Sequence, residues 1–124
     1  MKVLMIDDNE LDLLISKKLI SRQDDSLQFT EFTSAIAALQ SLKALDQIPY
    51  DVILLDLNMP EMDGWGFLEE YQKLGHAKSV VYILTSSLDS RDKSRSEEFW
   101  TVKGYFDKPL KNHYIEEIIA HQLS

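Results

Sequence analysis

The stretch Val52-Ile53-Leu54-Leu55-Asp56, followed by Leu57-Asn58-Met59-Pro60 and Asp63-Gly64, decides the fold of this chain. Its four consecutive apolar residues predict a short strand buried on both faces, like a strand in the middle of a parallel sheet. The run ends on Asp56, which we expect at the carboxyl edge of the sheet, where open α/β sheets bind their ligands. The residues that follow are turn formers and lead the chain towards a helix. Taken alone, Asp56 fits a helix cap, an ion pair or a reactive group.

Four further apolar runs predict strands at residues 3–6, 27–32, 80–84 and 104–106, with 27–32 at the edge of the sheet. Apolar residues at helical spacing predict helices at 10–21, 35–45, 67–74 and 114–119. Leu11, Leu14, Ile15 and Leu19 are the expected buried stripe of the first helix, and Asn9 with Asp12 has the spacing of a reciprocal helix cap. Residues 90–98 are almost wholly polar, so a helix there is expected to dock weakly.

Strands and helices therefore alternate five times with short connections. This pattern predicts an α/β fold with a five-stranded parallel sheet, helices on both faces and right-handed crossovers. A length of 124 residues suits a single domain over 1–124 with nothing appended.

Composition limits the functions that the chain can have. It has 44% hydrophobic and 27% charged residues, as soluble globular proteins do, and no cysteine, which fits a reducing compartment. We find no secretory leader and no apolar run long enough for a bilayer, so a cytoplasmic protein without membrane contact is expected. The net charge of −8 disfavours direct binding of nucleic acid.

Reactive side chains follow four of the five predicted strands. Asp7-Asp8 follows the first strand, Asp56 the third, Thr85-Ser86 the fourth and Lys108 the fifth. Parallel strands end at one edge, so these residues are expected to converge. Three carboxylates repel one another unless a cation is present, and their oxygen ligands suit Mg²⁺. A hydroxyl and an ammonium opposite them are what a phosphoryl group needs. The sequence thus predicts a site that moves phosphate onto Asp56.

These motifs resemble those of the receiver domain of two-component response regulators, in its stand-alone, CheY-like form. The resemblance rests on Asp7-Asp8, Asp56 with Asn58-Met59-Pro60 and Asp63-Gly64, Thr85-Ser86, and Tyr105 before Lys108-Pro109. It covers the whole chain, and it implies the flavodoxin-like strand order 2-1-3-4-5. It also implies one receiver domain without an output domain.

The resemblance further implies a role for each residue. Asp56 is the expected phosphoacceptor, supplied by a sensor histidine kinase or a histidine phosphotransfer protein. Mg²⁺, with Mn²⁺ as a substitute, is expected on Asp7, Asp8, Asp56 and the backbone carbonyl of Asn58. Thr85 and Lys108 are expected to contact the phosphoryl group, with Asn58 and Ser86 beside it, and the bond before Pro109 is expected to be cis. Such a module is not an enzyme beyond its own phosphorylation and dephosphorylation.

The resemblance also implies a switch. Phosphorylation of Asp56 is expected to draw Thr85 inward, and Tyr105 to move into the vacated space. The surface formed by the fourth helix, fifth strand and fifth helix is then expected to change shape and to bind a downstream protein effector. The sequence does not name this effector. Departures from the family pattern lie at Ser86, which is often alanine there, and at Ser87 and Asn58, whose positions tune dephosphorylation in the family.

Three alternative functions compete with this interpretation. A degenerate receiver used as a constitutive scaffold usually lacks one of the acids or the lysine, and all are present here. A phosphohydrolase of the haloacid dehalogenase type needs a second aspartate two residues after the nucleophile, where Asn58 stands. A nucleotide-binding Rossmann domain needs a glycine-rich loop after the first strand, where the chain has acids instead.

Overall fold

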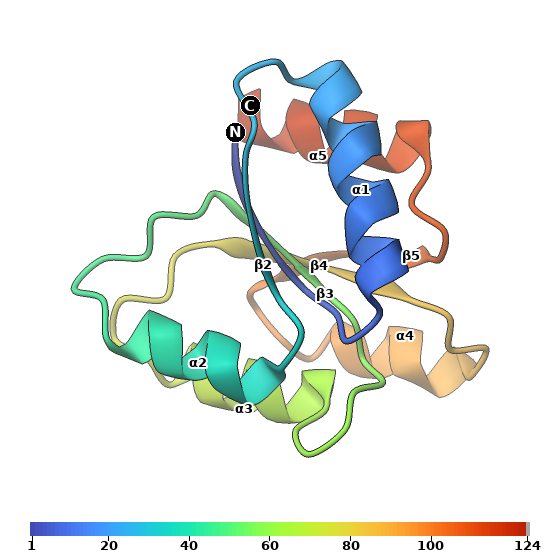
Figure 1. Cartoon of the computed structure of the whole chain (residues 1–124). Coiled ribbons are helices and arrows are strands. Elements are labelled where there is room, and N and C mark those ends of the chain that lie inside the picture. Colours follow the sequence, from blue (N-terminus) through green and yellow to red (C-terminus); the bar gives the residue numbers. More distant parts are fainter. Residues whose placement is uncertain (124) are drawn as a thin grey trace.

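The computed structural model describes residues 1–123 and places five parallel strands in the order β2-β1-β3-β4-β5, as predicted (Figure 1). The strands are β1 (Lys2–Ile6), β2 (Gln28–Phe32), β3 (Val52–Leu55), β4 (Val80–Thr85) and β5 (Val102–Asp107). The helices are α1 (Glu10–Gln23), α2 (Ala35–Lys43), α3 (Gly64–Gln72), α4 (Ser90–Ser96) and α5 (Asn112–Leu123). The flavodoxin-like α/β fold is confirmed.

Each face of the sheet has its own hydrophobic cluster, because successive strand residues point to opposite faces. Leu4, Ile53 and Ile83 pack with α2 and α3 on one face, where Phe99 and Tyr105 also lie against the cluster. Val3, Leu54 and Leu84 pack with α1 and α5 on the other face. Figure 1 shows α1 and α5 on one side of the sheet and α2, α3 and α4 on the other. β3 is buried along its whole length, as the run at 52–55 predicted.

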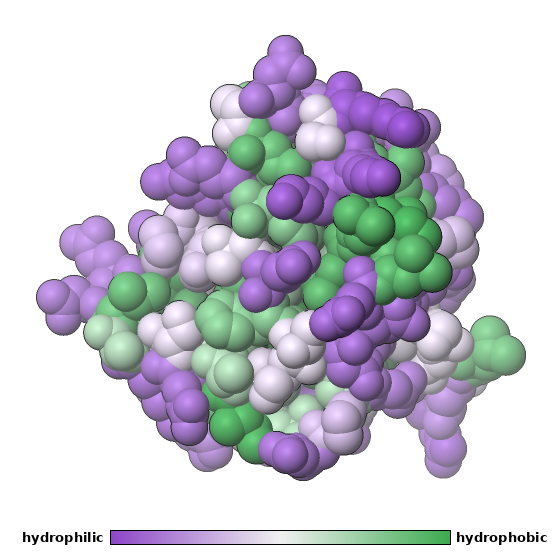
Figure 2. Space-filling view, viewed as in Figure 1, coloured by the Kyte–Doolittle hydropathy of each residue, from purple (hydrophilic) through white to green (hydrophobic). Residues whose placement is uncertain are grey.

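The predicted buried stripe of α1 is wrong for three of its four residues. Leu11, Leu14 and Ile15 are 62%, 48% and 38% exposed, whereas Leu19 is partly buried against the core. The buried residues of the helix are Leu13, Ser16 and Ile20. Apolar residues surround much of this helix, so periodicity permits two faces, and packing on the sheet selects the second. Figure 2 shows the resulting apolar patch on the outer surface of α1.

The two tryptophans differ in their packing. Trp65 is buried, stacks on Phe99 with ring centroids 5.8 Å apart, and carries the Arg95 guanidinium 4.6 Å from its ring centroid. Trp100 is 63% exposed. Phe99 occupies the place against Trp65, and its chain neighbour is left outside the core.

Candidate functional site

Backbone pairing brings the predicted site residues to one edge of the sheet. Ile6 is the register partner of Leu55, and the Asp56 N–H donates to the Ile6 carbonyl at 3.0 Å, so Asp7 and Asp56 leave neighbouring strands side by side. On the other flank, the Lys108 N–H donates to the Thr85 carbonyl at 2.8 Å. Four residues far apart in sequence thus meet because their strands are parallel.

The three predicted acids form a compact cluster. Asp7, Asp8 and Asp56 each place one carboxylate oxygen within 4.8 Å of the others. Asp7 is 0% and Asp56 5% exposed, whereas Asp8 is at the surface. Within residues 1–123 this is the one cluster of at least three such side chains that could hold a metal ion.

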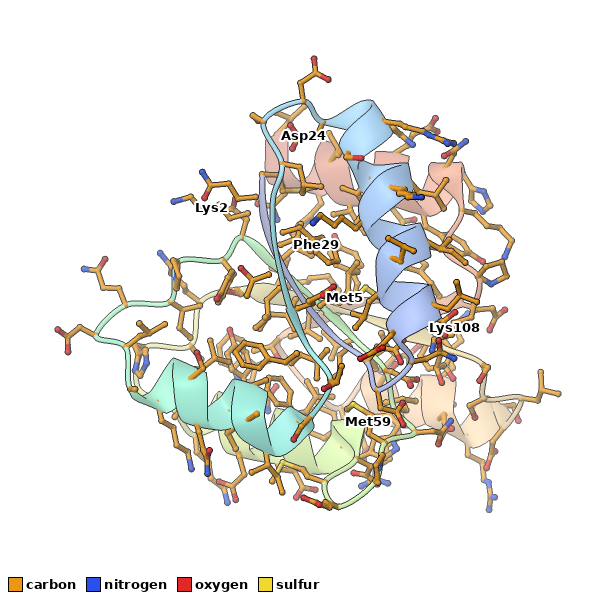
Figure 3. The ribbon with its side chains drawn as sticks, in the orientation of Figure 1. Lys2, Met5, Asp24, Phe29, Met59 and Lys108 are labelled. Atoms are coloured by element: carbon orange, nitrogen blue, oxygen red, sulfur yellow. The ribbon has the colours of Figure 1, made fainter. Side chains whose placement is uncertain are left out.

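Lys108 reaches into this cluster from the end of β5. Its Nζ lies 2.7 Å from Asp7 Oδ2 and 3.5 Å from Asp56 Oδ2. The peptide bond between Lys108 and Pro109 is cis, as expected. Figure 3 shows Lys108 beside the start of α1, at the opposite end of the sheet from Asp24.

Burial makes the carboxylates costly to charge. Loss of hydration, and then the neighbouring charge of Asp7, raise the pKa of Asp56 to about 6, although Lys108 acts in the opposite direction. Burial likewise raises the pKa of Asp7. The pKa of Lys108 is raised, since the acids around it outweigh its own burial. The site therefore holds more negative charge than one ammonium can balance.

The donor set fits a hard divalent cation. Oδ1 of Asp56 is buried without a hydrogen-bond partner among the described residues, and such an atom needs a compensating contact. All the side-chain donors of the cluster are carboxylate oxygens, the ligand type that Mg²⁺ prefers. An acidic triad of this kind is typical of the Mg²⁺ site of receiver domains.

Thr85 ends β4 with its side chain fully buried, and its Oγ accepts the N–H of Ser87 at 3.1 Å. Ser87 Oγ in turn donates to Asp92 Oδ2 at 2.6 Å. The loop after β4 therefore connects the strand end at the site to α4.

Tyr105 lies half-buried in β5 against the cluster that α2 and α3 cover. Burial, and then the Asp92 carboxylate, raise the pKa of its hydroxyl. Asn58 and Ser86 are exposed beside the site. Their predicted contacts to a phosphoryl group stay predictions, as do the switch roles of Thr85 and Tyr105.

The sequence assigned Asp12 to a reciprocal helix cap, and half of that assignment is wrong. Asn9 Oδ1 does accept the Asp12 N–H, at 3.1 Å. The Asn9 N–H, however, donates to Asp7 Oδ1 at 2.9 Å, and the Asp12 carboxylate lies 2.8 Å from Lys108 Nζ. Asp12 thus belongs to the site. No local signal in the sequence marks this role, because the partner of Asp12 lies 96 positions along the chain.

Comparison with known proteins identifies the family. A family model described as the response regulator receiver domain matches residues 3–120. The chain belongs to this receiver family. It is a signalling module of two-component systems rather than a classical enzyme. In this family, receiver domains pair with histidine kinases.

Curated relatives and solved structures agree with this assignment. The receiver is 33% identical over 122 residues to the sensor histidine kinase CheAY of Helicobacter pylori, covering 98% of this chain but only 15% of that protein. It is 32% identical over 90 residues to a probable chemotaxis protein CheY of Rhizobium etli, covering 73% of this chain and 67% of the relative. A crystal structure of a two-component response regulator from Cytophaga hutchinsonii has a TM-score of 0.87 at 29% identity, with 98% and 96% of the two chains covered.

Proposed function

We propose that Asp56 is the phosphoacceptor of this receiver. The observation that carries the proposal is the buried Asp56 carboxylate, with an unpaired Oδ1, between two further acids and the Lys108 ammonium. An oxygen of Asp56 attacks the phosphorus of a phosphohistidine; the O–P bond forms as the P–N bond breaks, and the imidazole leaves with the bonding electrons. Water later hydrolyses the acyl phosphate and regenerates the carboxylate. The chain's own part is positioning and charge neutralisation, which phosphoryl transfer mainly requires.

Mg²⁺, or Mn²⁺ in its place, would be held by Asp7, Asp8, Asp56 and the backbone carbonyl of Asn58, and when bound it supplies positive charge that neutralises phosphoryl oxygens. Lys108 supplies a second positive charge from the other flank. Thr85 donates its hydroxyl hydrogen to the phosphoryl group, and the exposed Asn58 and Ser86 side chains line the approach. The acidic triad and the unpaired Asp56 oxygen support this arrangement.

The phosphorylated site signals through the face of α4, β5 and α5. The hydrogen bonds from Thr85 through Ser87 to Asp92 support this route, because a movement of Thr85 pulls on the first turn of α4. Tyr105 lies in β5 between that loop and the core. Its side chain moves into the space that Thr85 leaves. The effector that reads this face is a protein.

The phosphodonor is a sensor histidine kinase or a histidine phosphotransfer protein, and it docks on α1. Leu11, Leu14 and Ile15 form an exposed apolar patch at the start of this helix, directly after the acids of the site. Exposed apolar patches are typical of protein contacts. A cytoplasmic location belongs to the same proposal. Among residues 1–123, no helix combines the length and apolar character that crossing a bilayer requires.

The deciding experiment is intact-mass spectrometry after incubation with phosphoramidate, with and without Mg²⁺, beside an Asp56→Asn control. The expected result is a Mg²⁺-dependent gain of one phosphoryl group that the control lacks. No gain in a folded protein would refute the phosphoacceptor role and leave the constitutive scaffold as the function to pursue.

A further inference from the structure

Lys108 contacts three carboxylates, although its proposed role is to contact a phosphoryl group on one of them, Asp56. Its Nζ lies 2.7 Å from Asp7, 2.8 Å from Asp12 and 3.5 Å from Asp56. The ammonium therefore sits closer to the two acids near the start of α1 than to the carboxylate that is to carry the phosphoryl group. Charge-assisted hydrogen bonds of N–O length 2.7–2.9 Å are the strong ones, whereas 3.5 Å is a weak contact.

The position of Asp12 is fixed by a closed ring of contacts. Asp7 Oδ1 accepts the N–H of Asn9, and Asn9 Oδ1 accepts the N–H of Asp12. Asp12 Oδ2 binds Lys108, which returns to Asp7. Asp12, Ser16 and Ile20 are spaced four residues apart and so share one face of α1. Ser16 and Ile20 are buried, so this face packs against the rest of the domain. Asp12 is 29% and Lys108 13% exposed in their side chains, so water screens this pair only partly.

We propose that Asp12 is a positioning residue that holds the Lys108 ammonium away from Asp56 and competes with the phosphoryl group for it. The inference rests on the proposed function, because a phosphoryl group on Asp56 gains the lysine only by drawing it from Asp12. Asp12 thereby limits both the rate of phosphorylation and the lifetime of the acyl phosphate. Asp12 touches no reacting atom and acts through Lys108.

A plainer role for Asp12 is to stabilise the start of α1 with its negative charge. Glu10 lies in the same first turn, is exposed, and carries the same charge. Glu10→Gln is therefore a matched control. It removes the same charge from the same helix end, and Glu10 does not contact Lys108.

The test measures the rate of phosphorylation by phosphoramidate in Mg²⁺ and the half-life of the phosphorylated protein. Asp12→Asn keeps the shape of the side chain and is expected to raise the rate and lengthen the half-life, each roughly three- to tenfold, as the loss of a competing charged hydrogen bond implies. Glu10→Gln is expected to leave both within about twofold of wild type, as an exposed charge change would. An unchanged or slower Asp12→Asn protein overturns the proposal.

A double-mutant cycle tests whether the effect passes through the lysine. In a Lys108→Gln background, Asp12→Asn is expected to change the rate by less than about twofold; the same gain as in wild type would mean that Asp12 acts on the donor directly. NMR of the lysine ammonium groups gives a reading that needs no phosphorylation. Asp12→Asn is expected to shift the Lys108 signal, and Glu10→Gln is expected to leave it in place. An unshifted Lys108 signal in Asp12→Asn would refute the proposal that Asp12 holds the ammonium. A wild-type protein that takes no phosphoryl group refutes the proposed function as well, whereas a phosphorylated wild type with an unaltered Asp12→Asn variant refutes this inference alone.

Discussion

Gly64 packs so closely against Asp56 that a Cβ atom on it would lie 2.6 Å from the Asp56 backbone carbonyl oxygen. The next nearest atom would be the Cα of Leu57 at 2.9 Å, so the obstacle is backbone that cannot rotate away. The Gly64 N–H also donates to the Leu57 carbonyl at 2.9 Å. The start of α3 thus sets the backbone position of the proposed phosphoacceptor.

Gly64→Ala should therefore damage both the fold and the site. The added methyl must push the β3 end and α3 apart, which we expect to cost about 1–3 kcal/mol of the free energy of unfolding. Phosphorylation by phosphoramidate should slow at least about tenfold, because a shift of Asp56 misplaces the attacking oxygen. Urea denaturation and the phosphorylation rate measure the two effects.

Gly75→Ala is the matched control. A Cβ there meets nothing within 4 Å, and no glycine among the described residues has a positive φ angle. The change should leave the phosphorylation rate as it is and raise stability by about 0.4–1 kcal/mol, because alanine restricts the unfolded chain. Equal stability losses for both variants would contradict the close-packing explanation.

Asp56→Asn should stabilise the metal-free protein at neutral pH. Burial raises the pKa of Asp56 to about 6 from the ordinary 3.8, so the folded state binds this proton more tightly than the unfolded chain. The wild type therefore loses up to about 3 kcal/mol of its free energy of unfolding as pH rises from about 4 to 6. Asparagine does not ionise, so the variant does not lose this stability.

Urea denaturation in EDTA at pH 4.5 and pH 7.5 measures this difference. We expect the variant to exceed the wild type at pH 7.5 and the gap to narrow at pH 4.5. Mg²⁺ should then stabilise the wild type more than the variant, since it offsets the charge that asparagine lacks. A variant that is less stable than wild type at both pH values would show that Lys108 already compensates Asp56.

Asp8→Ala tests the metal assignment by itself. Asp8 is exposed and is the one acid of the triad whose loss leaves no buried gap, so the fold should be kept. Removing one of the few carboxylate ligands should weaken Mg²⁺ binding at least about tenfold in a calorimetric titration. Glu10→Gln, which removes a nearby charge outside the triad, is the control. Equal affinities for Asp8→Ala and wild type would exclude Asp8 as a ligand.

The sequence predicted the edge of the sheet better than it predicted the helices that cover it. The residues that follow each strand were placed correctly because strand ends are marked by abrupt changes from apolar to charged residues. Asp7, Asp56 and Lys108 meet as expected, since parallel strands leave no other common edge. The strand order itself came from the family resemblance, because hydrophobic runs carry no information about which strands are neighbours.

Rotation of α1 could not be read from spacing. Leu11, Leu14 and Ile15 have helical spacing as good as that of Leu13 and Ile20, and only packing against the sheet decides between the two faces. The same rotation brings Asp12 to Lys108, so one error concealed both a surface patch and a member of the site. The Asp12–Lys108 contact joins residues 96 positions apart, and the orientation of α1 depends on its packing against the sheet and α5. A local sequence pattern contains neither contact.

The patch on α1 leads to the last prediction. Leu11→Gln with Leu14→Gln removes apolar surface that makes no contribution to the core, so stability should change by less than about 0.5 kcal/mol. Transfer from a phosphorylated sensor histidine kinase that serves the wild type should fall roughly five- to tenfold, as loss of a contact residue at an interface implies. Transfer from phosphoramidate needs no docking and should stay at the wild-type rate.

The control is Leu123→Gln, which changes an 84% exposed leucine at the end of α5, at the opposite end of the sheet from the site (Figure 1). Both donors should phosphorylate this variant at wild-type rates. If the double variant loses rate with phosphoramidate as well, the substitutions have disturbed the site through the start of α1. If it loses rate with neither donor, the kinase docks elsewhere, and the apolar patch serves another partner.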